Sequence, residues 1–507
     1  MQDYFDKVRA SRIYEVVRET PIDHMPLLSL RLANKVLLKR EDLQKVFSFK
    51  LRGAYHKLCQ LSESQREVGV VAASAGNHAQ GVAMAARSLN VNATIVMPET
   101  TPQIKLDAVR FWGVNVVLYG DTFDEAFSFA KKLESDKGLV FVHPFDDLDV
   151  IVGQGTIGLE IVDQVENPLD AIFVPVGGGG LLAGIATYVH HYWPKTKIYG
   201  VEPEDAASLK LAFEVGSPKK LEEVGLFVDG CAVSQVGAEN FRLIREVVDT
   251  VVTVSTDEIC AAVKDIFEDT RVIAEPAGAL ALAGLKKLVF QEKINSSNLL
   301  AILSGANTNF DRLRYISERT EIGERREAIL SVTIQEEPGS FLKFCAVLGK
   351  RNITEFNYRF NDSRTARVFV GLSIHPENDD IGGLIAKLEG EGYEALDLTD
   401  NEMAKLHIRY MVGGQAISAH LHERAYRVEF PERPGALFKF LKALGSQWNI
   451  SMFHYRNHGA AYGRILLGVD VFEAEKEKFE ALLHGIGYPF SDETDNPAYR
   501  LYLVGDI

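Results

Sequence analysis

A lysine that follows two aromatic residues and precedes a predicted helix is the first candidate for chemistry in this chain of 507 residues. Lys50 follows Phe47 and Phe49, and residues 47–51 carry no carboxylate that could pair with its amine. Apolar residues recur at helical spacing from residue 54 onward, which predicts that the lysine lies at the start of a helix. In a desolvated pocket the charged form of a lysine is disfavoured, and the neutral amine can form a Schiff base with an aldehyde. Taken alone, the pattern also fits a surface lysine at a helix start.

A loop with several backbone N–H donors follows the apolar run at residues 70–73. The loop opens a helical stretch and consists of Ser74, Ala75, Gly76, Asn77 and His78. The N–H groups at the start of a helix have no partner within the helix, so they are suited to binding a carboxylate. The Asn77 side chain can also donate to an oxygen anion. The alternative interpretation is a plain helix N-cap.

Four consecutive glycines form a second loop, after the apolar run at residues 171–176. The loop consists of Gly177, Gly178, Gly179 and Gly180, and Leu181 begins the next helical stretch. Glycines let the backbone curl around a tetrahedral anion, with the helix dipole behind it. No Lys-Ser or Lys-Thr pair follows, so the loop is not a Walker A site. A cradle for the phosphate of a small cofactor fits better than a tight turn, which rarely needs four glycines.

Ser304 ends the last apolar run of this part of the chain. A hydroxyl at this place can cap the next helix, or it can hydrogen-bond a heteroaromatic nitrogen. The chain thus offers a lysine that can capture an aldehyde, an oxyanion donor, a phosphate cradle and a hydroxyl for a ring nitrogen. Together these four features are typical of a pyridoxal phosphate site.

Short apolar runs alternate with longer helical patterns between about residues 20 and 320. The alternation predicts largely parallel sheets with helices on both faces, and such sheets bind ligands at the carboxyl ends of their strands. Strands are predicted at 36–39, 70–73, 93–97, 115–119, 171–176, 197–201, 251–254 and 299–303. Helices are predicted at 78–89, 104–112, 123–133, 181–191 and 256–267. Both candidate loops and Ser304 therefore follow predicted strands.

A third glycine pattern, at residues 153–158, matches the dinucleotide-binding motif GxGxxG. It follows only the short apolar run 150–152, and Asp170, the acid about twenty residues further on, precedes its strand instead of ending it. We therefore expect a helix start at this place and no nicotinamide site.

The composition narrows the class of protein. A formal net charge of −15 argues against general nucleic-acid binding, and 46% apolar with 25% charged residues is ordinary for a soluble protein. The four cysteines are widely spaced, which predicts reduced thiols and no zinc site. The first 18 residues lack the apolar core of a signal peptide, and proline and glycines interrupt the longest apolar stretch, 171–189. We expect a cytoplasmic enzyme without a membrane span.

The chain repeats itself after about residue 320. Pro338 and Gly339 are matched 96 residues later by Pro434 and Gly435, and residues 356–359 are matched by residues 453–456. Each repeat predicts the order strand, helix, strand, strand, helix, strand of a ferredoxin-like α+β unit. The Pro-Gly turn before the first helix presents backbone N–H groups to a small anion. A pair of dimerisation modules without a ligand is the alternative.

The motifs together resemble the fold-type II pyridoxal-phosphate enzymes. They lie at residues 48–54, 74–78, 177–181, 274–278 and 304–307. From about residue 10 to the C-terminus, the chain is most similar to the biosynthetic threonine ammonia-lyases, also called threonine deaminases. The resemblance implies a catalytic domain of two parallel-sheet subdomains at residues 1–322. Two ferredoxin-like, ACT-like regulatory domains follow, at 328–400 and 423–494.

The resemblance also assigns roles to the site residues. Lys50 holds pyridoxal 5'-phosphate covalently and then removes the Cα proton of the substrate, while Asn77 contacts the ring oxygen. Gly177–Leu181 bind the phosphate, and Ser304 meets the pyridine nitrogen with a neutral hydroxyl, which favours β-elimination over transamination. The substrate carboxylate binds to the loop Ser74–His78.

The implied reaction is deamination of L-threonine, with L-serine as a second substrate, to give 2-oxobutanoate from threonine. This is the first committed step of isoleucine biosynthesis. Isoleucine is expected to inhibit the enzyme and valine to oppose that inhibition, through the turns at Pro338-Gly339 and Pro434-Gly435. The resemblance further implies a homotetramer.

Three alternatives stay open: a serine dehydratase, a β-replacing synthase of the same fold, and an amino-acid sensor whose catalytic half is inactive. A serine racemase is disfavoured, because Ala75 stands where racemases of this fold carry a serine. Their metal-binding segment resembles residues 202–208, but it ends in an acid where this chain has Ser208. We therefore expect no metal.

Overall fold

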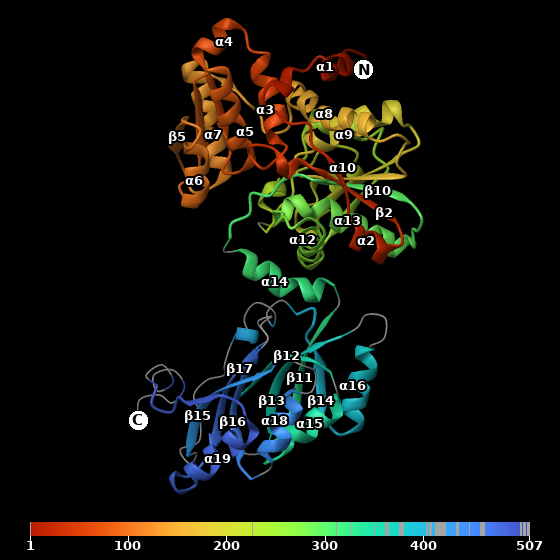
Figure 1. The fold of residues 1–507 in the computed structure, drawn as a ribbon. Helices are drawn as coiled ribbons and strands as arrows, with labels where there is room; N and C mark the ends of the chain where they lie inside the picture. The colour runs from red at the N-terminus through yellow and green to blue at the C-terminus, as the bar shows by residue number, and fades with distance from the viewer. Residues whose placement is uncertain are drawn as a thin grey trace. The chain divides into compact units, whose positions relative to one another are not determined.

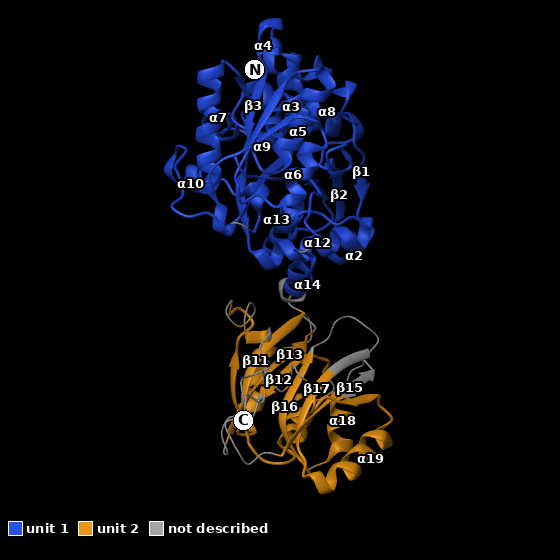
Figure 2. Cartoon of the chain, turned by 90° about the vertical axis from the view of Figure 1, so that its left-hand side faces the viewer, with its two compact units in different colours: residues 1–323 blue, residues 324–507 orange. Residues whose placement is uncertain are grey.

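The computed structural model describes residues 2–225, 227–310, 312–324, 326–349, 351–359, 365–374, 380–401, 404, 408–410, 422–431, 436–445, 447–456, 462–496, 499 and 503. The chain divides into two compact units, residues 1–323 and residues 324–507 (Figure 2). Pro434 and Gly435, two of the residues predicted to bind effectors, lie outside the described residues. Within the described ranges, no helix combines the length and apolar character needed to cross a membrane.

The larger sheet of the first unit has six strands, in the order β1-β2-β10-β7-β8-β9. Only β1 is antiparallel to its neighbour. Successive residues of the central strand pack on opposite faces: Leu299, Ala301 and Leu303 on one, Leu300 and Ile302 on the other. The strands are β1 (Ile22–His24), β2 (Lys35–Arg40), β10 (Asn298–Leu303), β7 (Ala171–Pro175), β8 (Lys197–Pro203) and β9 (Thr250–Val254). This sheet is therefore covered by helices on both faces, as continuous apolar strands require.

Helices from distant parts of the sequence cover the larger sheet (Figure 1). One face packs against α12 (Thr256–Thr270) and α13 (Pro276–Glu292), and the other against α8 (Leu148–Gln164) and α9 (Gly180–Tyr192). Further helices of this unit are α1 (Gln2–Arg9), α2 (Pro26–Leu32), α4 (Glu63–Val68), α10 (Ser208–Val215), α11 (Ala238–Ile244) and α14 (Arg312–Gly323).

The smaller sheet of the first unit has four parallel strands in the order β5-β4-β3-β6. Val70 and Ala72 pack toward α5 and α6, whereas Val71 and Ala73 pack toward α7. The strands are β5 (Asn115–Leu118), β4 (Ala93–Met97), β3 (Val70–Ala73) and β6 (Val140–Phe141), and the helices are α5 (Asn77–Leu89), α6 (Gln103–Arg110) and α7 (Phe123–Lys137). The two parallel-sheet subdomains confirm the predicted fold class.

One predicted element is wrong. Residues 153–158 were expected to begin a helix, but they lie inside α8, which begins at Leu148. The start is fixed upstream, where the Asp147 carboxylate accepts the N–H groups of Asp149 (2.9 Å) and Val150 (3.3 Å). An aspartate N-cap therefore determines this helix start, and the glycine pattern has another purpose.

The glycines inside α8 allow close contact with two neighbouring helices. A Cβ atom on Gly153 would lie 2.6 Å from the backbone oxygen of Arg52 in α3 (Lys50–Cys59). A Cβ on Gly158 would lie 3.2 Å from the backbone oxygen of Ile185 in α9. The GxGxxG pattern is thus a helix-packing feature, and α3 lies between α5 and α8 (Figure 1).

The second unit contains one eight-stranded antiparallel sheet, in the order β14-β11-β13-β12-β16-β17-β15-β18. The first repeat contributes β11 (Glu327–Gln335), α15 (Ser340–Leu348), β12 (Ile353–Arg359), β13 (Thr365–Ser373), α16 (Ile381–Gly390) and β14 (Glu394–Asp397). The second contributes β15 (Glu423–Pro431), α18 (Ala436–Leu444), β16 (Asn449–Arg456), β17 (Tyr462–Asp470), α19 (Lys476–Ile486) and β18 (Phe490–Asp492). Both repeats therefore have the predicted ferredoxin-like order.

The two repeats join through the strands that carry the repeated motif. In the β12–β16 pair, Phe356 lies opposite Tyr455 and Tyr358 opposite Phe453. The motif residues of one repeat thus face the corresponding residues of the other in reversed order, which is the pattern of a local two-fold axis. The repeats share one sheet, whose helices and strands enclose a common apolar core.

Candidate active site

Lys50 is the first residue of α3, and its backbone is tied to the end of β10. Ser48 forms an isolated β-bridge with Gly305, and the Phe49 N–H donates to the Ser304 carbonyl at 3.1 Å. The Lys50 amine donates to the carbonyl of Pro144 at 2.8 Å. The structure therefore brings Lys50 and Ser304, which are 254 positions apart in the sequence, to one edge of the larger sheet.

The surroundings of Lys50 favour the neutral amine. Burial lowers the pKa of the Lys50 amine to about 8, and electrostatic interactions with Cys231 and Glu275 offset part of that effect. No ion pair to this amine is formed within the described residues. A lysine with such a pKa is a nucleophile and a proton acceptor near neutral pH.

The four-glycine loop packs against Phe145. This residue follows Pro144, whose carbonyl accepts the hydrogen bond from the Lys50 amine. A Cβ on Gly178 would overlap the ring of Phe145, and a Cβ on Gly180 would lie 2.8 Å from the Phe145 carbonyl. Gly179 adopts a φ of 93°, a conformation that favours glycine, just before α9 begins. Because Pro144 binds the Lys50 amine and Phe145 packs on the glycines, the amine and the loop lie at the same site.

The loop after β3 is more constrained than the sequence suggested. The N–H of Ser74 donates to Val96 (3.1 Å), and the N–H of Gly76 donates to the Ser74 hydroxyl (3.2 Å). Two of the five predicted donors are therefore already in use. His78 contacts the Val142 carbonyl at 2.9 Å, and burial lowers the pKa of its ring to about 3. This histidine is neutral and holds the start of α5 in place.

Asn77 lies in a chain of side-chain hydrogen bonds that the sequence analysis did not predict. Its amide nitrogen donates to Glu275 at 2.6 Å, and its amide oxygen accepts from Asn307 at 2.7 Å. Burial raises the pKa of the Glu275 carboxyl to about 7, with Asp229 as a further cause. Glu275 and Asn307 belong to motifs that carried the family resemblance, but their spacing from Asn77 gave no sign of direct contact.

Ser304 is buried directly after β10. Its hydroxyl donates to the carbonyl of Ala277 at 3.2 Å, near the start of α13. No ionisable partner of this hydroxyl is present among the residues described. The hydroxyl therefore contacts an uncharged backbone carbonyl.

The residues at this site fit pyridoxal phosphate. The Ser48 hydroxyl, two residues before Lys50, is buried and has no hydrogen-bond partner in the described structure. A buried polar atom without a partner is uncommon, and a polar ligand is one way to satisfy it. The aldehyde-reactive amine, the glycine loop at the start of α9 and the Ser304 hydroxyl complete the set of groups that this cofactor requires.

Family models match nearly the whole chain. Residues 13–305 match the model described as pyridoxal-phosphate dependent enzyme. Residues 318–408 and 414–503 match the model described as the C-terminal regulatory domain of threonine dehydratase. The chain belongs to the threonine dehydratase family of pyridoxal-phosphate-dependent enzymes.

Individual proteins of this family, or with this fold, are similar to the chain over long stretches. The L-threonine dehydratase biosynthetic IlvA of Burkholderia multivorans is 52% identical, over 99% of both chains. The processed form of threonine deaminase isoform 2 from Solanum lycopersicum is 49% identical, with a TM-score of 0.62 over 63% of this chain and 92% of that one. Serine racemase from Dictyostelium discoideum is 35% identical, with a TM-score of 0.56 over 61% and 98%.

The segment compared with the metal site of racemases has another arrangement here. The Glu202 carboxylate accepts the N–H groups of Leu209 (2.8 Å) and Lys210 (2.9 Å) at the start of α10. Burial raises the pKa of Glu202 to about 7. The described part of the chain contains no cluster of three or more His, Cys, Asp or Glu side chains suited to a metal ion.

Proposed function

We propose that this protein converts L-threonine into 2-oxobutanoate and ammonia with pyridoxal phosphate, as the first committed step of isoleucine biosynthesis. One observation carries the proposal. The Lys50 amine binds Pro144, and the adjacent Phe145 packs against the four-glycine loop. A cofactor held covalently by this lysine therefore has a phosphate site within reach. The similarity to threonine dehydratases along the whole chain supports threonine as the substrate.

Each site residue has a distinct role in the proposed reaction. Bound pyridoxal phosphate supplies an electron sink that weakens the bond between Cα and its hydrogen. Gly177–Leu181 hold the phosphate with the N–H groups at the start of α9. The Lys50 amine, whose pKa is about 8, takes up the Cα proton as a general base. With the cofactor bound, the Ser304 hydroxyl, which donates to the Ala277 carbonyl in the structure, would turn and donate to the ring nitrogen without adding charge.

The substrate carboxylate binds in the loop between β3 and α5. Since the N–H groups of Ser74 and Gly76 already have acceptors, Ala75, Asn77 and His78 supply the remaining backbone donors of the loop. The helix dipole of α5 adds to the attraction for the anion. The Asn77 side chain, oriented by Glu275 and Asn307, would contact the ring oxygen of the cofactor.

L-Serine is the second candidate substrate, because it offers the same β-hydroxyl and lacks only a methyl group. A hydrophobic pocket discriminates against one missing methyl group by only about 10–200-fold, so we expect measurable turnover of serine. Racemisation is not expected, because Ala75 cannot serve as an acid on the second face of the substrate. Rates on threonine and serine, with formation of D-serine as a third measurement, separate these activities.

We assign regulation to the second unit. We propose that it holds two ACT-like domains, at residues 328–400 and 423–494. The Pro338-Gly339 turn opens α15 with Gly339 at a φ of 89°, so its backbone donors precede a helix. Pro434 and Gly435 occupy the corresponding place in the repeated sequence. Isoleucine is proposed to inhibit and valine to oppose it. We further propose a cytoplasmic homotetramer.

Replacement of the lysine tests the proposed function. The Lys50→Ala variant should keep its fold but lose at least the roughly 10²–10⁴-fold that acid–base catalysis typically contributes. Formation of 2-oxobutanoate is the measurement, and Lys45→Ala, an exposed lysine five residues earlier, is the control. Near-normal turnover by Lys50→Ala would refute the assignment.

A further inference from the structure

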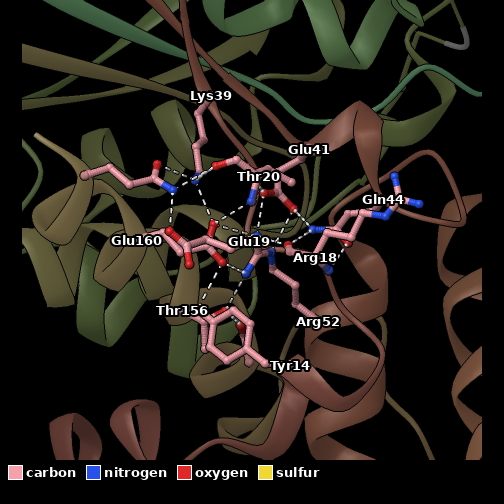
Figure 3. A network of polar contacts seen from close by, with 12 residues as sticks. Tyr14, Arg18, Glu19, Thr20, Lys39, Glu41, Gln44, Arg52, Thr156 and Glu160 are labelled. Carbon is pink, nitrogen blue, oxygen red and sulfur yellow. Dashed lines mark hydrogen bonds and ion pairs between the residues drawn. The ribbon is translucent and has the colours of Figure 1, made fainter.

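A network of four buried charges lies directly behind the start of α3 (Figure 3). Its members are Arg52 of α3, Lys39 of β2, Glu41 after β2 and Glu160 of α8. The side chains are at most 2% exposed. The network thus joins α3, which packs on the smaller sheet, to β2 of the larger sheet and to α8, which packs on the larger sheet.

Arg52 uses its whole guanidinium group in this network. It donates to both oxygens of Glu41 at 2.8 and 2.7 Å, and to both oxygens of Glu160 at 2.6 and 2.9 Å. A further N–H reaches the Thr156 hydroxyl at 3.1 Å. Only the planar guanidinium of an arginine can contact two carboxylates in this way, since all N–H donors of a lysine lie on one nitrogen atom.

The rest of the network balances the charges. The Lys39 amine donates to Glu160 at 2.7 Å and to the Thr20 carbonyl at 2.6 Å. The Thr20 hydroxyl donates to Glu41 at 2.6 Å, and the Tyr14 hydroxyl donates to Glu160 at 3.0 Å. Two cations and two anions are therefore enclosed together, and the N-terminal segment closes the network.

Stability alone is a weak explanation for such a network. Removing charges from water is costly, and apolar side chains of similar volume often stabilise a protein as well or better. The network does supply a fixed geometry, because each of the two carboxylates is held by several donors.

Two neighbouring helices fix the backbone at Lys50, and no side-chain cap contributes. Phe49, the N-cap residue, forms no capping hydrogen bond with its side chain. In front of the helix, a Cβ on Gly81 of α5 would lie 3.0 Å from the Lys50 carbonyl carbon. Behind it, Gly153 of α8 lies against the backbone of Arg52. Small shifts of α3 would therefore move Lys50 directly.

We propose that Arg52, held by Glu41 and Glu160, is a positioning residue that fixes the start of α3 and thereby the reach and direction of the Lys50 amine. This inference rests on the proposed role of Lys50. Arg52 lies two residues from Lys50, and hence on the opposite side of the helix, so it acts through the backbone without touching the reacting atoms. Misplacement of a catalytic group by about 1 Å can cost roughly 10²-fold in rate.

Two substitutions separate positioning from charge balance. Arg52→Met leaves a carboxylate without a cation, whereas the double variant Arg52→Met/Glu41→Gln leaves the complete Lys39–Glu160 pair. The double variant should regain most of the thermal stability lost in the single one. In both variants kcat should fall about 10–100-fold, with KM for threonine changed less than about 3-fold. A double variant with parental stability and parental kcat would overturn the proposal.

Spectroscopy gives a readout that does not depend on turnover. The visible circular dichroism of the bound cofactor reports its orientation at Lys50, so we expect a changed amplitude in Arg52→Lys at full cofactor occupancy. Arg52→Lys keeps the charge but not the fork, so its kcat should stay at least 5-fold below the parent. Parental dichroism and kcat in Arg52→Lys would contradict the inference.

Control variants distinguish a failure of the Arg52 proposal from a failure of the proposed function of Lys50. Asp265→Asn disturbs another ion cluster, in which a buried carboxylate pairs with the partly exposed Arg31 and Lys286. It should reduce stability while leaving kcat and dichroism unchanged. If the Arg52 variants do not fold, Glu41→Gln tests the same contact with one acceptor retained. Its kcat should fall a few-fold at constant KM, and an unchanged kcat would refute the proposal. Turnover by Lys50→Ala would instead refute the proposed function.

Discussion

Ser304 is the residue whose charge state should decide the outcome of the reaction. A neutral hydroxyl leaves the ring nitrogen of the cofactor unprotonated, whereas an aspartate at this place would keep it protonated and prolong the life of a carbanion. We expect Ser304→Asp to eliminate water from threonine at least 10-fold more slowly and to develop a long-wavelength absorbance with substrate. Stopped-flow absorbance measures both. If spectra and rates match the parent, Ser304 does not face the ring.

Glu275 should make the stability of the protein depend on pH. Its pKa is about 7 in the folded protein, above the ordinary value of 4.5, because the carboxyl is buried. The folded state therefore binds the proton more tightly than the unfolded state, and this contribution to stability is present below pH 4.5 and is lost as the pH rises through 7. A shift of this size corresponds to roughly 3 kcal/mol at most.

The Glu275→Gln variant isolates that effect. An amide cannot lose a proton, and its oxygen still accepts the bond from Asn77. Between pH 5 and 8.5 the parent should lose free energy of unfolding relative to the variant, measured by urea denaturation. Glu202, whose pKa is also about 7, contributes equally to both proteins. A parent-to-variant difference that stays constant over this range would show that Glu275 is ionised throughout.

Sequence reasoning identified the reactive lysine but not its neighbours. Lys50 could be predicted because its local sequence lacks carboxylates and opens a helix, which are features of a few adjacent residues. The contacts Asn77–Glu275 and Arg52–Glu160 join residues 198 and 108 positions apart. Single-sequence patterns contain no information on such pairs, so the hydrogen-bond chain and the charge network emerge only from the folded chain.

The glycine loop between β7 and α9 is an element whose shape should control cofactor affinity. A methyl group on Gly178 would overlap the ring of Phe145, which follows the acceptor of Lys50. We expect Gly178→Ala to raise the Kd for pyridoxal phosphate at least 10-fold, or about 1.4 kcal/mol. Titration of the apo protein, followed by visible absorbance, gives the value.

A glycine without close neighbours provides the control for Gly178. Gly485 lies in α19, has open space around its Cβ position and adopts no positive φ. Gly485→Ala should leave cofactor affinity unchanged and should slightly stabilise the helix. Equal cofactor affinity in both variants would mean that the loop after β7 does not hold the phosphate.

Elements with a strong apolar pattern were predictable, and elements shaped by their neighbours were not. The strands at 70–73 and 93–97 agree with β3 and β4 because their residues are buried on both faces. β6 has only two residues, too few for any pattern. The glycines within α8 normally disfavour a helix, but contact with α3 and α9 outweighs that preference.

At the scale of the whole molecule, the sequence showed the repeat. It did not show that the two repeats form one continuous sheet. The hydrogen bonds between β12 and β16 join strands from different repeats, and no local signal marks them. The shared sheet makes the two regulatory repeats one structural body, and described residues of both are buried in a common core. An effector that bound to one repeat, as proposed, would therefore act on a sheet and core that continue into the other.

The division of the chain predicts that catalysis can be separated from control. The first unit, residues 1–323, contains Lys50, the glycine loop and Ser304, whereas the regulatory domain match begins at residue 318. Truncation after Gly323 should leave a lyase that binds cofactor but ignores isoleucine.

Threonine saturation curves with and without isoleucine test this separation in the full-length and truncated proteins. Coupling between effector and substrate sites is typically about 1–3 kcal/mol, so isoleucine should shift the apparent affinity of the full-length protein by roughly 5–150-fold. Isoleucine has no β-hydroxyl to eliminate, so it is not a substrate, and we expect it to act away from Lys50. The cofactor absorbance of the truncated protein is checked first, because a damaged fold would also abolish regulation. Sigmoidal, isoleucine-shifted kinetics in a correctly folded truncated protein would place the effector site in the first unit, against the proposal.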